Sequence, residues 1–310
     1  MQKELSQIAL IGFGEAGSTI AATMAASMAD PGQLAGARVY DIKLADDDAA
    51  TAAGMQQSIE SAGMAACATP ADAVAGADII LCVVTADQAA KAAALSARHL
   101  AKGALWLDMN SCAPTTKQIA AKPVESAGAI YVDIAIMAPI QPRGHNTPML
   151  AAAADPDAVA ERLQTIGLAP TFVGADIGRA STIKMLRSVM IKGMEALSAE
   201  CFRAAVRAGV ETDVAASLDA SEGGDWAARA SYNMERMTAH GIRRAAEMRE
   251  VAKTLRDLGI APMMTTGTIT HEQEMGEVGQ SITLDAAMPI AEQMARIEAA
   301  LQDLSSQPTD

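Results

Sequence analysis

Short apolar runs alternate with longer alanine-rich segments through the first half of the chain. The short runs predict buried strands, which we place at residues 8–13, 37–42, 78–85, 103–110 and 129–137. The longer segments carry polar positions at helical spacing and predict helices at 15–28, 46–63, 69–77, 86–100 and 113–128. Strands that alternate with helices in this way predict a doubly wound parallel sheet with helices on both faces.

Residues at the ends of the predicted helices support these boundaries. Acidic residues open the helix at 46–63, and Thr69 followed by Pro70 is a typical helix start. The sequence Asp-Pro-Gly at 30–32 is expected to stop the first helix.

The pattern changes after residue 178, because almost everything from 179 to about 302 has helical periodicity. We therefore predict an α/β domain at 1–176 followed by an all-α domain at 177–310.

Composition narrows the functional classes. The chain has 310 residues, of which 50% are hydrophobic, and a formal net charge of −13. This length is enough for two domains with their own cores. The acidic balance argues against a nucleic-acid-binding protein, which needs a basic face. No run approaches the roughly 18 apolar residues of a membrane span, and no signal-peptide pattern opens the sequence.

Four cysteines lie far apart and form no CxxC pair: Cys67, Cys82, Cys112 and Cys201. This spacing indicates neither a disulfide framework nor a zinc site, so we expect no metal. A reducing cytoplasm is the compartment that the cysteine pattern favours.

The sequence IGFGEAG contains a GxGxxG pattern that follows a predicted strand and opens a helix. In such a loop Gly12 permits a tight turn, Gly14 lets the backbone approach a pyrophosphate, and Gly17 lets helix and strand pack closely. The pattern favours a Rossmann-type dinucleotide site, although a purely structural turn is the alternative. The predicted cofactor-binding loop consists of Gly12, Phe13, Gly14, Glu15, Ala16 and Gly17.

Asp41, at the end of the second predicted strand, strengthens the cofactor interpretation. An acidic residue there accepts hydrogen bonds from the adenosine ribose and repels the additional phosphate of NADP. We therefore expect NAD as the cofactor, with NADP as the alternative because Lys43 lies nearby. A solvated aspartate in a loop is the structural alternative.

Three segments carry a further pattern: IGFGEAGSTIA from Ile11, LDMNSCAP from Leu107, and GRASTIKMLRSVMIKGMEALSAE from Gly178. In order, they resemble the dinucleotide loop, the D-x-S-T-x-x-P loop beside the nicotinamide, and the catalytic-lysine helix of the β-hydroxyacid dehydrogenase family. That family includes relatives of 3-hydroxyisobutyrate and 6-phosphogluconate dehydrogenases. The resemblance spans roughly residues 5–205, and the helical part is most similar to a less characterised subgroup.

The resemblance implies that Lys184 is the general acid/base. Oxidation of an alcohol requires a base for the hydroxyl proton, and a base works best when its pKa is near the operating pH. Burial and the nearby positive charges of Arg179, Arg187 and Lys192 are expected to lower the pKa of Lys184. A surface lysine on an amphipathic helix is the alternative.

Two departures from the family pattern concern the substrate. The family's asparagine, four residues after the lysine, is replaced by Ser188, a shorter hydrogen-bonding group. The family's D-x-P-x-S-G-G turn reads DIAIMAP, which puts Met137 and Pro139 at the site of the carboxylate clamp. Because proline has no N–H, we expect bulkier or more apolar substrates to be preferred over small sugar acids.

Basic residues of the helical domain are candidates to replace the missing clamp. His240, Arg243 and Arg244 lie in a segment that resembles the family's second substrate-facing helix, and helical spacing suggests one shared face. Arginine recognises carboxylates well. A solvated charged face is the alternative.

Four other residues stand at informative positions. Asn110 and Ser111 replace the family's serine and threonine near the nicotinamide, with a loop cap as the alternative for Asn110. Thr85 ends a strand at the sheet edge where cofactors collect. Trp226 is either a pocket wall or part of the core. We assign Cys112 no role, because no histidine partner is evident.

The predicted activity is hydride transfer between a nicotinamide and a 3-hydroxy acid or related alcohol, with decarboxylation left open. Imine reduction and cofactor binding without catalysis are the alternatives. A small-molecule substrate is the expected partner, and the resemblance implies a homodimer formed through the helical domain.

Overall fold

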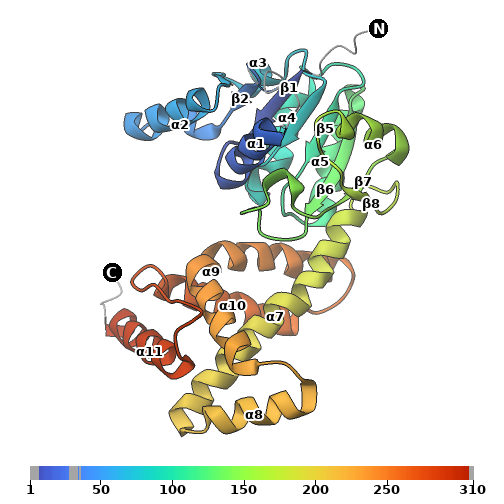
Figure 1. The fold of residues 1–310 in the computed structure, drawn as a ribbon. Coiled ribbons are helices and arrows are strands. Elements are labelled where there is room, and N and C mark those ends of the chain that lie inside the picture. Colours follow the sequence, from blue (N-terminus) through green and yellow to red (C-terminus); the bar gives the residue numbers. More distant parts are fainter. Residues whose placement is uncertain (1–6, 28–33, 35, 307–310) are drawn as a thin grey trace. The chain divides into compact units, whose positions relative to one another are not determined.

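The computed structural model describes residues 7–27, 34 and 36–306, which form two compact units (Figure 1). The first unit ends at Lys184 and the second begins at Met185. This division falls inside the long helix α7, Arg179–Ala208, whereas the sequence pattern predicts a boundary just upstream at 176–177.

One eight-stranded sheet organises the described part of the first unit, with the order β3-β2-β1-β4-β5-β6-β7-β8. The strands are β1 Ile8–Ile11, β2 Arg38–Tyr40, β3 Ala65–Ala66, β4 Ile79–Cys82, β5 Leu105–Asp108, β6 Ile130–Ile136, β7 Met149–Ala152 and β8 Thr171–Phe172. The strand order reverses at β1, which pairs in parallel with β2 on one side and β4 on the other. Ligands of doubly wound sheets bind beyond the carboxyl ends of the strands at such a point.

The pairing of β6 with β7 is antiparallel, although every other pair in the sheet is parallel. The stretch 137–148 between these two strands contains no α-helix, only the 3-10 turn η4, Gly144–Asn146. A parallel neighbour of β6 would need a crossover connection, which is usually helical. This connection has no α-helix, and β7 returns beside β6 in the antiparallel direction. The alternating pattern of the sequence predicts parallel strands alone, and β7 is the exception.

Helices cover both faces of the sheet. They are α1 Glu15–Ser27, α2 Ala49–Ser61, α3 Pro70–Val74, α4 Ala89–Ala97, α5 Pro114–Ser126 and α6 Pro156–Gln164, with the 3-10 turns η2 Ile42–Ala45 and η3 Ala86–Gln88. Ile20 of α1 packs in one core with Leu107 of β5, while Val124 of α5 packs in a second core with Trp106 of the same strand. Successive strand residues point to opposite faces, so one strand contributes to both cores. The predicted Rossmann-type fold is confirmed.

The ends of the helices follow the predicted chemistry where they are described. Asp48 caps α2 by accepting hydrogen bonds from the backbone N–H groups of Ala50 and Thr51. The Thr69 hydroxyl accepts from the N–H of Asp72 at 3.2 Å at the start of α3. The expected stop of the first helix at 30–32 lies outside the described residues.

The second unit is helical throughout its described residues. After α7 come α8 Glu211–Glu222, α9 Trp226–Asp257, α10 Met263–Val278 and α11 Ile290–Ser306. Its core contains Phe202 of α7, Met234 of α9, Met275 of α10 and Ile297 of α11. The predicted all-α region after the sheet is confirmed.

Helices α9 and α10 approach each other closely through glycine. A Cβ atom added to Gly241 would lie 2.2 Å from the carbonyl oxygen of Glu272, which is too close for any side chain. Within the residues that the structure describes, no helix has both the length and the apolar character needed to cross a membrane.

Candidate cofactor and active site

The glycine-rich loop joins β1 to α1 at the switch point of the sheet. Gly12 has a φ of +94°, and its N–H donates to the carbonyl oxygen of Tyr40 at 2.8 Å. A Cβ atom at Gly12 would lie 2.2 Å from the carbonyl oxygen of Val83, and one at Gly17 would lie 2.4 Å from the carbonyl oxygen of Gly12. Both glycines are therefore required by the close packing of β1, β4 and α1.

Gly14 lies in a different environment from the other two glycines. A Cβ atom added there would have nothing within 4 Å. The residue is exposed beside Glu15, the first residue of α1, whereas Phe13 is buried and Ala16 is half-buried against the core. The space above Gly14 therefore lies at a helix N-terminus, where unpaired N–H groups favour an anion such as phosphate.

The carboxylate of Asp41 is 8% exposed and connects this loop to the segment after β2. Its Oδ2 accepts from the N–H of Phe13 at 2.7 Å, and its Oδ1 accepts from the N–H of Lys43 at 2.9 Å. A carboxylate has about four lone-pair sites, so these two bonds leave acceptor capacity for hydroxyl groups.

The loop after β5 is fixed by Asn110, which is 4% exposed. Its Nδ2 donates to Asp108 Oδ1 at 2.7 Å, and its Oδ1 accepts from the N–H of Val84 at 2.6 Å. The polar atoms of this side chain thus bind the protein itself and hold the ends of β4 and β5 together. Ser111 differs, because its Oγ is buried and has no hydrogen-bond partner among the described residues.

Thr85 is exposed just beyond β4 and precedes the turn η3. Its side chain makes a hydrogen bond with Asp87, which helps to lower the pKa of that carboxyl group. Cys112, which follows Ser111, is fully buried.

A fully buried lysine, which the sequence reasoning missed, lies under this loop. Lys117 of α5 is 0% exposed, and its Nζ donates to the carbonyl oxygen of Asp108 at 2.6 Å and to Asp108 Oδ1 at 2.8 Å. Asp133 Oδ1 is 3.5 Å from the same nitrogen. Burial alone would lower the pKa of Lys117, but the carboxylate of Asp108 and neighbouring acidic groups raise it above its ordinary value. The ammonium group is therefore charged inside the protein.

The signal for Lys117 is present in the sequence. Lys117, Ala121 and Val124 recur at helical spacing on the buried face of α5. Two aspartates, Asp108 and Asp133, interrupt the apolar runs that form neighbouring strands. A buried lysine requires buried acidic partners, so these three residues could have been connected.

Asp133 fixes the beginning of α7, the helix that carries Lys184. Its Oδ2 accepts from the N–H groups of Gly178 and Ser181 at 3.1 Å each, and its Oδ1 accepts from Ser181 Oγ at 2.6 Å. Lys184 follows one turn later, is half-buried and is the last residue of the first unit. The helix α7, which carries Lys184, is thus anchored to β6, the strand that pairs with β5.

Two of the charges expected to act on Lys184 are engaged elsewhere. Lys192 Nζ lies 2.7 Å from Glu247 Oε2, and Arg179 Nε donates to the carbonyl oxygen of Val173. The Lys192 charge is therefore compensated by a carboxylate of the helical unit.

The turn after β6 offers few donors for an anion. The N–H of Met137 donates to the carbonyl oxygen of Pro148 at 2.9 Å, and Pro139 has no N–H. Met137 is half-buried and packs against a small apolar cluster that includes Ala135 and Ala180. Met137 and Pro139 therefore have no spare backbone N–H to donate to a carboxylate.

The basic residues proposed to replace that clamp do not share one environment. His240 and Arg243 are exposed, but Arg244 is only 3% exposed. Arg244 Nε donates to Glu272 Oε1 at 3.1 Å, and the guanidinium also pairs with Glu195. A buried charge needs such partners, and they occupy the group that we expected to bind substrate. The expectation of one shared face is corrected for Arg244.

Two other expected contacts lie in the helical unit. Ser188 is 8% exposed on α7, one turn beyond Lys184. Trp226, the first residue of α9, packs at the border of the helical core, and the guanidinium of Arg229 lies 4.8 Å from the centre of its ring.

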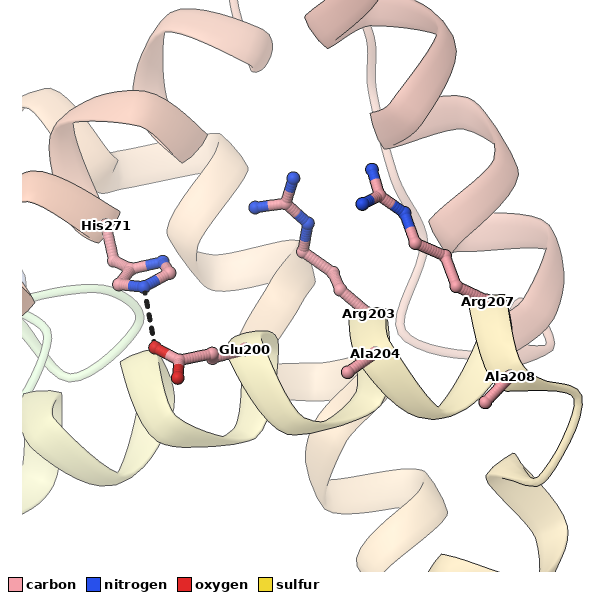
Figure 2. A pocket seen from close by; sticks show the side chains of 6 residues that line it. All are labelled: Glu200, Arg203, Ala204, Arg207, Ala208 and His271. Carbon is pink, nitrogen blue, oxygen red and sulfur yellow. Dashed lines mark hydrogen bonds and ion pairs between the residues drawn. The ribbon is translucent and has the colours of Figure 1, made fainter.

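The helical unit also has an open hollow of about 500 Å³ on α7 and α10, drawn in Figure 2. It is lined by Glu200, Arg203, Ala204, Arg207, Ala208 and His271. Figure 2 shows the side chains of Arg203 and Arg207 extending side by side from α7. Both pair with Glu298, and His271 Nε2 lies 3.2 Å from Glu200 Oε2. These basic groups are already paired, so the described residues of this hollow offer no free charge to attract an anionic cofactor.

Among the described residues, no three or more His, Cys, Asp or Glu side chains are arranged to hold a metal ion.

Comparison with protein families covers both units. Residues 7–166 match the family described as the NAD binding domain of 6-phosphogluconate dehydrogenase. Residues 205–275 match a domain of unknown function, DUF1932.

Solved structures give a consistent result. A conserved hypothetical protein from Sinorhizobium meliloti 1021 is 31% identical, with a TM-score of 0.76 over 96% of this chain and 98% of that one. The conserved protein MTH1747, described as structurally similar to 3-hydroxyacid dehydrogenases, is 29% identical, with a TM-score of 0.67 over 86% and 96% of the two chains. The 3-hydroxyisobutyrate dehydrogenase of Mycobacterium tuberculosis, studied with L-serine, shares the fold at 14% identity, with a TM-score of 0.67 over 94% and 98%.

The residues present fit a dinucleotide. The space at Gly14 would admit a pyrophosphate at the N-terminus of α1, and the unpartnered Ser111 Oγ offers a hydrogen-bonding group at the end of β5. The family match covers about half of the chain and contains both features. The chain therefore belongs to the β-hydroxyacid dehydrogenase-like family of NAD(P)-dependent oxidoreductases, with the NAD-binding domain of 6-phosphogluconate dehydrogenase followed by a helical C-terminal domain.

Proposed function

We propose that this protein is an NAD-dependent dehydrogenase of a 3-hydroxy acid or related alcohol, with Lys184 as general acid/base. The observation that carries this proposal is the anchoring of α7. Asp133 holds the first turn of that helix, and Lys117 lies between Asp133 and Asp108 at the base of the loop after β5. The helix that bears Lys184 is thus connected to the loop that we assign to the nicotinamide.

The chemistry requires one proton acceptor beside the reacting carbon. When bound, the oxidised nicotinamide supplies the hydride acceptor and the reduced form supplies the donor. The neutral amine of Lys184 takes the hydroxyl proton of the alcohol while the carbon loses hydride, so the alcohol becomes a carbonyl compound. In the reverse direction the ammonium group returns the proton to the carbonyl oxygen. For a 3-keto acid product, the same ammonium could hold the carbonyl oxygen during loss of carbon dioxide.

The substrate class follows from the turn after β6. The N–H of Met137 is occupied by Pro148, and Pro139 has none, so this turn contributes little to carboxylate binding. We propose that substrates are bulkier or more apolar than small sugar acids. We keep Ser188, Trp226, His240 and Arg243 as candidate substrate contacts. We no longer include Arg244, because Glu195 and Glu272 occupy its guanidinium group.

Cofactor preference is proposed from charge. Asp41 remains able to accept ribose hydroxyls. A 2′-phosphate would approach this carboxylate, so we propose NAD over NADP.

Residues 1–176 would bind the dinucleotide, and residues 177–310 would contribute substrate contacts and a homodimer interface. Among the described residues, twelve of the sixteen large exposed apolar side chains belong to the second unit. Such an excess is typical of interaction surfaces. The four free cysteines suit a reducing compartment, and we propose the cytoplasm.

The direct test replaces Lys184 with methionine, which keeps the chain length and removes the amine. We expect turnover to fall about 100-fold or more, the usual contribution of a general acid/base, while the protein still binds NAD. Lys91→Met, an exposed lysine of α4, is the matched control and should retain turnover. Activity of Lys184→Met near that of the unmodified protein would remove the amine from the mechanism.

The assay also separates the other activities. A panel of 3-hydroxy acids, sugar acids and imines identifies the reaction class. Preference for 6-phosphogluconate would contradict the apolar substrate proposal, and amine formation would indicate imine reduction. NAD binding without hydride transfer to any of these compounds would indicate a binding protein.

A further inference from the structure

The buried charges around Lys117 do not balance by side chains alone. One ammonium group faces two carboxylates, Asp108 and Asp133, and all three side chains are 0% exposed. Tyr131 adds a neutral donor, because its hydroxyl donates to Asp108 Oδ2 at 2.5 Å and burial raises its pKa. Isolated ionised groups are very costly to bury, so the remaining negative charge requires another partner.

The N-terminus of α7 is that partner. Asp133 accepts two backbone N–H groups and one hydroxyl from residues 178–181. The first turn of a helix carries a partial positive charge and unpaired N–H donors, which favour a carboxylate. The helix start therefore completes the neutralisation of Asp133, and Asp133 determines where α7 begins.

The other carboxylate determines the conformation of the loop after β5. Asp108 Oδ1 accepts both from the N–H of Asn110 at 3.0 Å and from its side-chain Nδ2 at 2.7 Å. The same oxygen accepts from Lys117 Nζ. One ammonium group thus lies between a carboxylate that shapes the loop 109–112 and a carboxylate that holds α7.

A buried ion cluster is a poor route to stability, because desolvation offsets much of the attraction. Apolar side chains of similar volume would pack this position of α5 at least as well. What the charged cluster adds is fixed geometry, since each hydrogen bond or ion pair sets the position of one group relative to another. Fixed geometry matters most at a reacting centre, where a displacement of about 1 Å can reduce the rate 100-fold.

We propose that Lys117 is a positioning residue, whose ammonium group joins the Asp108 loop to the Asp133-capped start of α7 and so keeps Lys184 in place beside the nicotinamide. The proposal rests on the proposed function for the role of Lys184. The coupling between the loop and α7 is independent of that role and can be measured separately.

The test uses Ser181→Ala, which removes one hydroxyl bond to Asp133 and leaves the buried ion pair intact. We expect faster hydrogen–deuterium exchange in residues 178–184, because the first turn of α7 loses an anchor. We expect NAD affinity to change less than about twofold and kcat to fall about tenfold or more with a smaller change in KM.

The pH profile gives a readout that a merely structural role would not change. A less ordered start of α7 changes the surroundings of the Lys184 amine, which govern the pH at which that amine transfers its proton. In the direction of alcohol oxidation the neutral amine is needed, so we expect the rising limb of kcat/KM to move to a different pH. Ser181→Thr keeps a hydroxyl and should restore the original profile.

Thr182→Ala is the matched control, because the Thr182 hydroxyl donates at 2.7 Å to the carbonyl oxygen of Gly178 within the same turn and does not contact Asp133. It should leave kcat and the pH profile near those of the unmodified protein. Lys117→Met should change hydrogen–deuterium exchange, kcat and the pH profile in the same way as Ser181→Ala, and by a larger amount. If Lys117→Met does not fold, the result for Ser181→Ala alone tests the proposal.

Exchange rates and a pH profile of Ser181→Ala that match those of Thr182→Ala would overturn the proposal. Faster exchange of 178–184 with full turnover in Lys184→Met would have a different meaning. It would uphold the mechanical coupling and reject the acid/base role on which the proposed function depends.

Discussion

Gly17 lies directly against Gly12 across the first turn of the dinucleotide loop, so that a methyl group at Gly17 would be 2.4 Å from the carbonyl oxygen of Gly12. Gly14, between them in the chain, has open space instead. The three glycines of one pattern therefore lie in two different environments, close packing for Gly12 and Gly17 and open space for Gly14.

We predict that Gly17→Ala and Gly14→Ala have different effects. Gly17→Ala forces α1 away from the loop and should destabilise the protein by about 1–3 kcal/mol, as overpacking usually does. Gly14→Ala should leave the unfolding midpoint almost unchanged but weaken NAD binding about tenfold or more, because the methyl group occupies the space of the pyrophosphate. Chemical denaturation and calorimetric titration with NAD measure the two effects.

The Gly14→Ala variant carries the informative outcome. Normal stability together with normal NAD affinity would show that no ligand approaches this backbone. Gly54→Ala, at a helical glycine of α2 that also has nothing within 4 Å, controls for the added methyl group.

The sequence predicts the sheet and the glycine loop well, because both follow from local patterns. Alternation of apolar runs and helices specifies strands, and Gly12, Gly14 and Gly17 stand at fixed spacing after one of them. The antiparallel strand β7 was harder to predict, since its direction depends on the length and lack of helix of the connection after β6.

The polar interior of the site could be predicted only in part. Asp108 and Asp133 look like strand residues, and Lys117 looks like one more charged position on α5, until the tertiary contacts are known. Arg244 shows the opposite failure. Helical spacing groups it with His240, but spacing alone does not reveal that Glu195 and Glu272 come from neighbouring helices and bury it.

Asp41 yields a prediction about cofactor choice. Asp41→Asn removes the negative charge, so repulsion of the NADP 2′-phosphate decreases. We expect the ratio of kcat/KM for NADP to that for NAD to rise about tenfold or more, which corresponds to ~1.4 kcal/mol. Some stability should be lost, about 1 kcal/mol, because an amide nitrogen replaces one oxygen that accepts from the N–H of Phe13 or Lys43.

Asp48→Asn is the appropriate comparison for that measurement. Asp48 is another acidic residue after β2, but it caps α2 and is exposed. Its substitution should change the cofactor ratio less than about twofold, because surface charges are screened. Equal changes in the two variants would mean that general surface charge, and not Asp41, governs the preference.

Glu272 yields a prediction about pH and stability. Its side chain is 0% exposed, and its Oε2 has no hydrogen-bond partner among the described residues. Burial raises the pKa of this carboxyl group although Arg244 opposes the change. The folded protein therefore binds this proton more tightly than the unfolded chain, and stability is lost as pH rises from the unfolded pKa of about 4.3 through the folded value.

Glu272→Gln removes that titration and keeps an oxygen to accept from Arg244 Nε. We expect Glu272→Gln to be more stable, relative to the unmodified protein, at pH 7.5 than at about pH 4.3. At the lower pH the raised pKa keeps Glu272 more protonated in the folded protein than in the unfolded chain, so the substitution changes less. Urea denaturation at the two pH values measures the difference, and Glu277→Gln, an exposed residue of the same helix, is the control. A loss of stability that is larger at pH 7.5 would show that attraction to Arg244 outweighs the cost of burial.

The segment 258–264, which joins α9 to α10 and includes the first two residues of α10, yields a prediction about assembly. Leu258, Ile260, Met263 and Met264 are exposed by 54%, 54%, 81% and 65%, and four large apolar side chains within seven residues are unusual on a monomer surface. If this segment forms part of the proposed dimer interface, a charge there must be desolvated on association, which disfavours the dimer. Light scattering should therefore give about twice 31.9 kDa for the unmodified protein and about 31.9 kDa for the double variant Met263→Asp, Met264→Asp.

Ile119→Asp, at a side chain of α5 that is 55% exposed in the first unit, introduces a charge of the same kind and should remain dimeric. An unmodified protein that is monomeric at micromolar concentration would exclude the helical-unit dimer, and dissociation of both variants would point to a general effect of added charge.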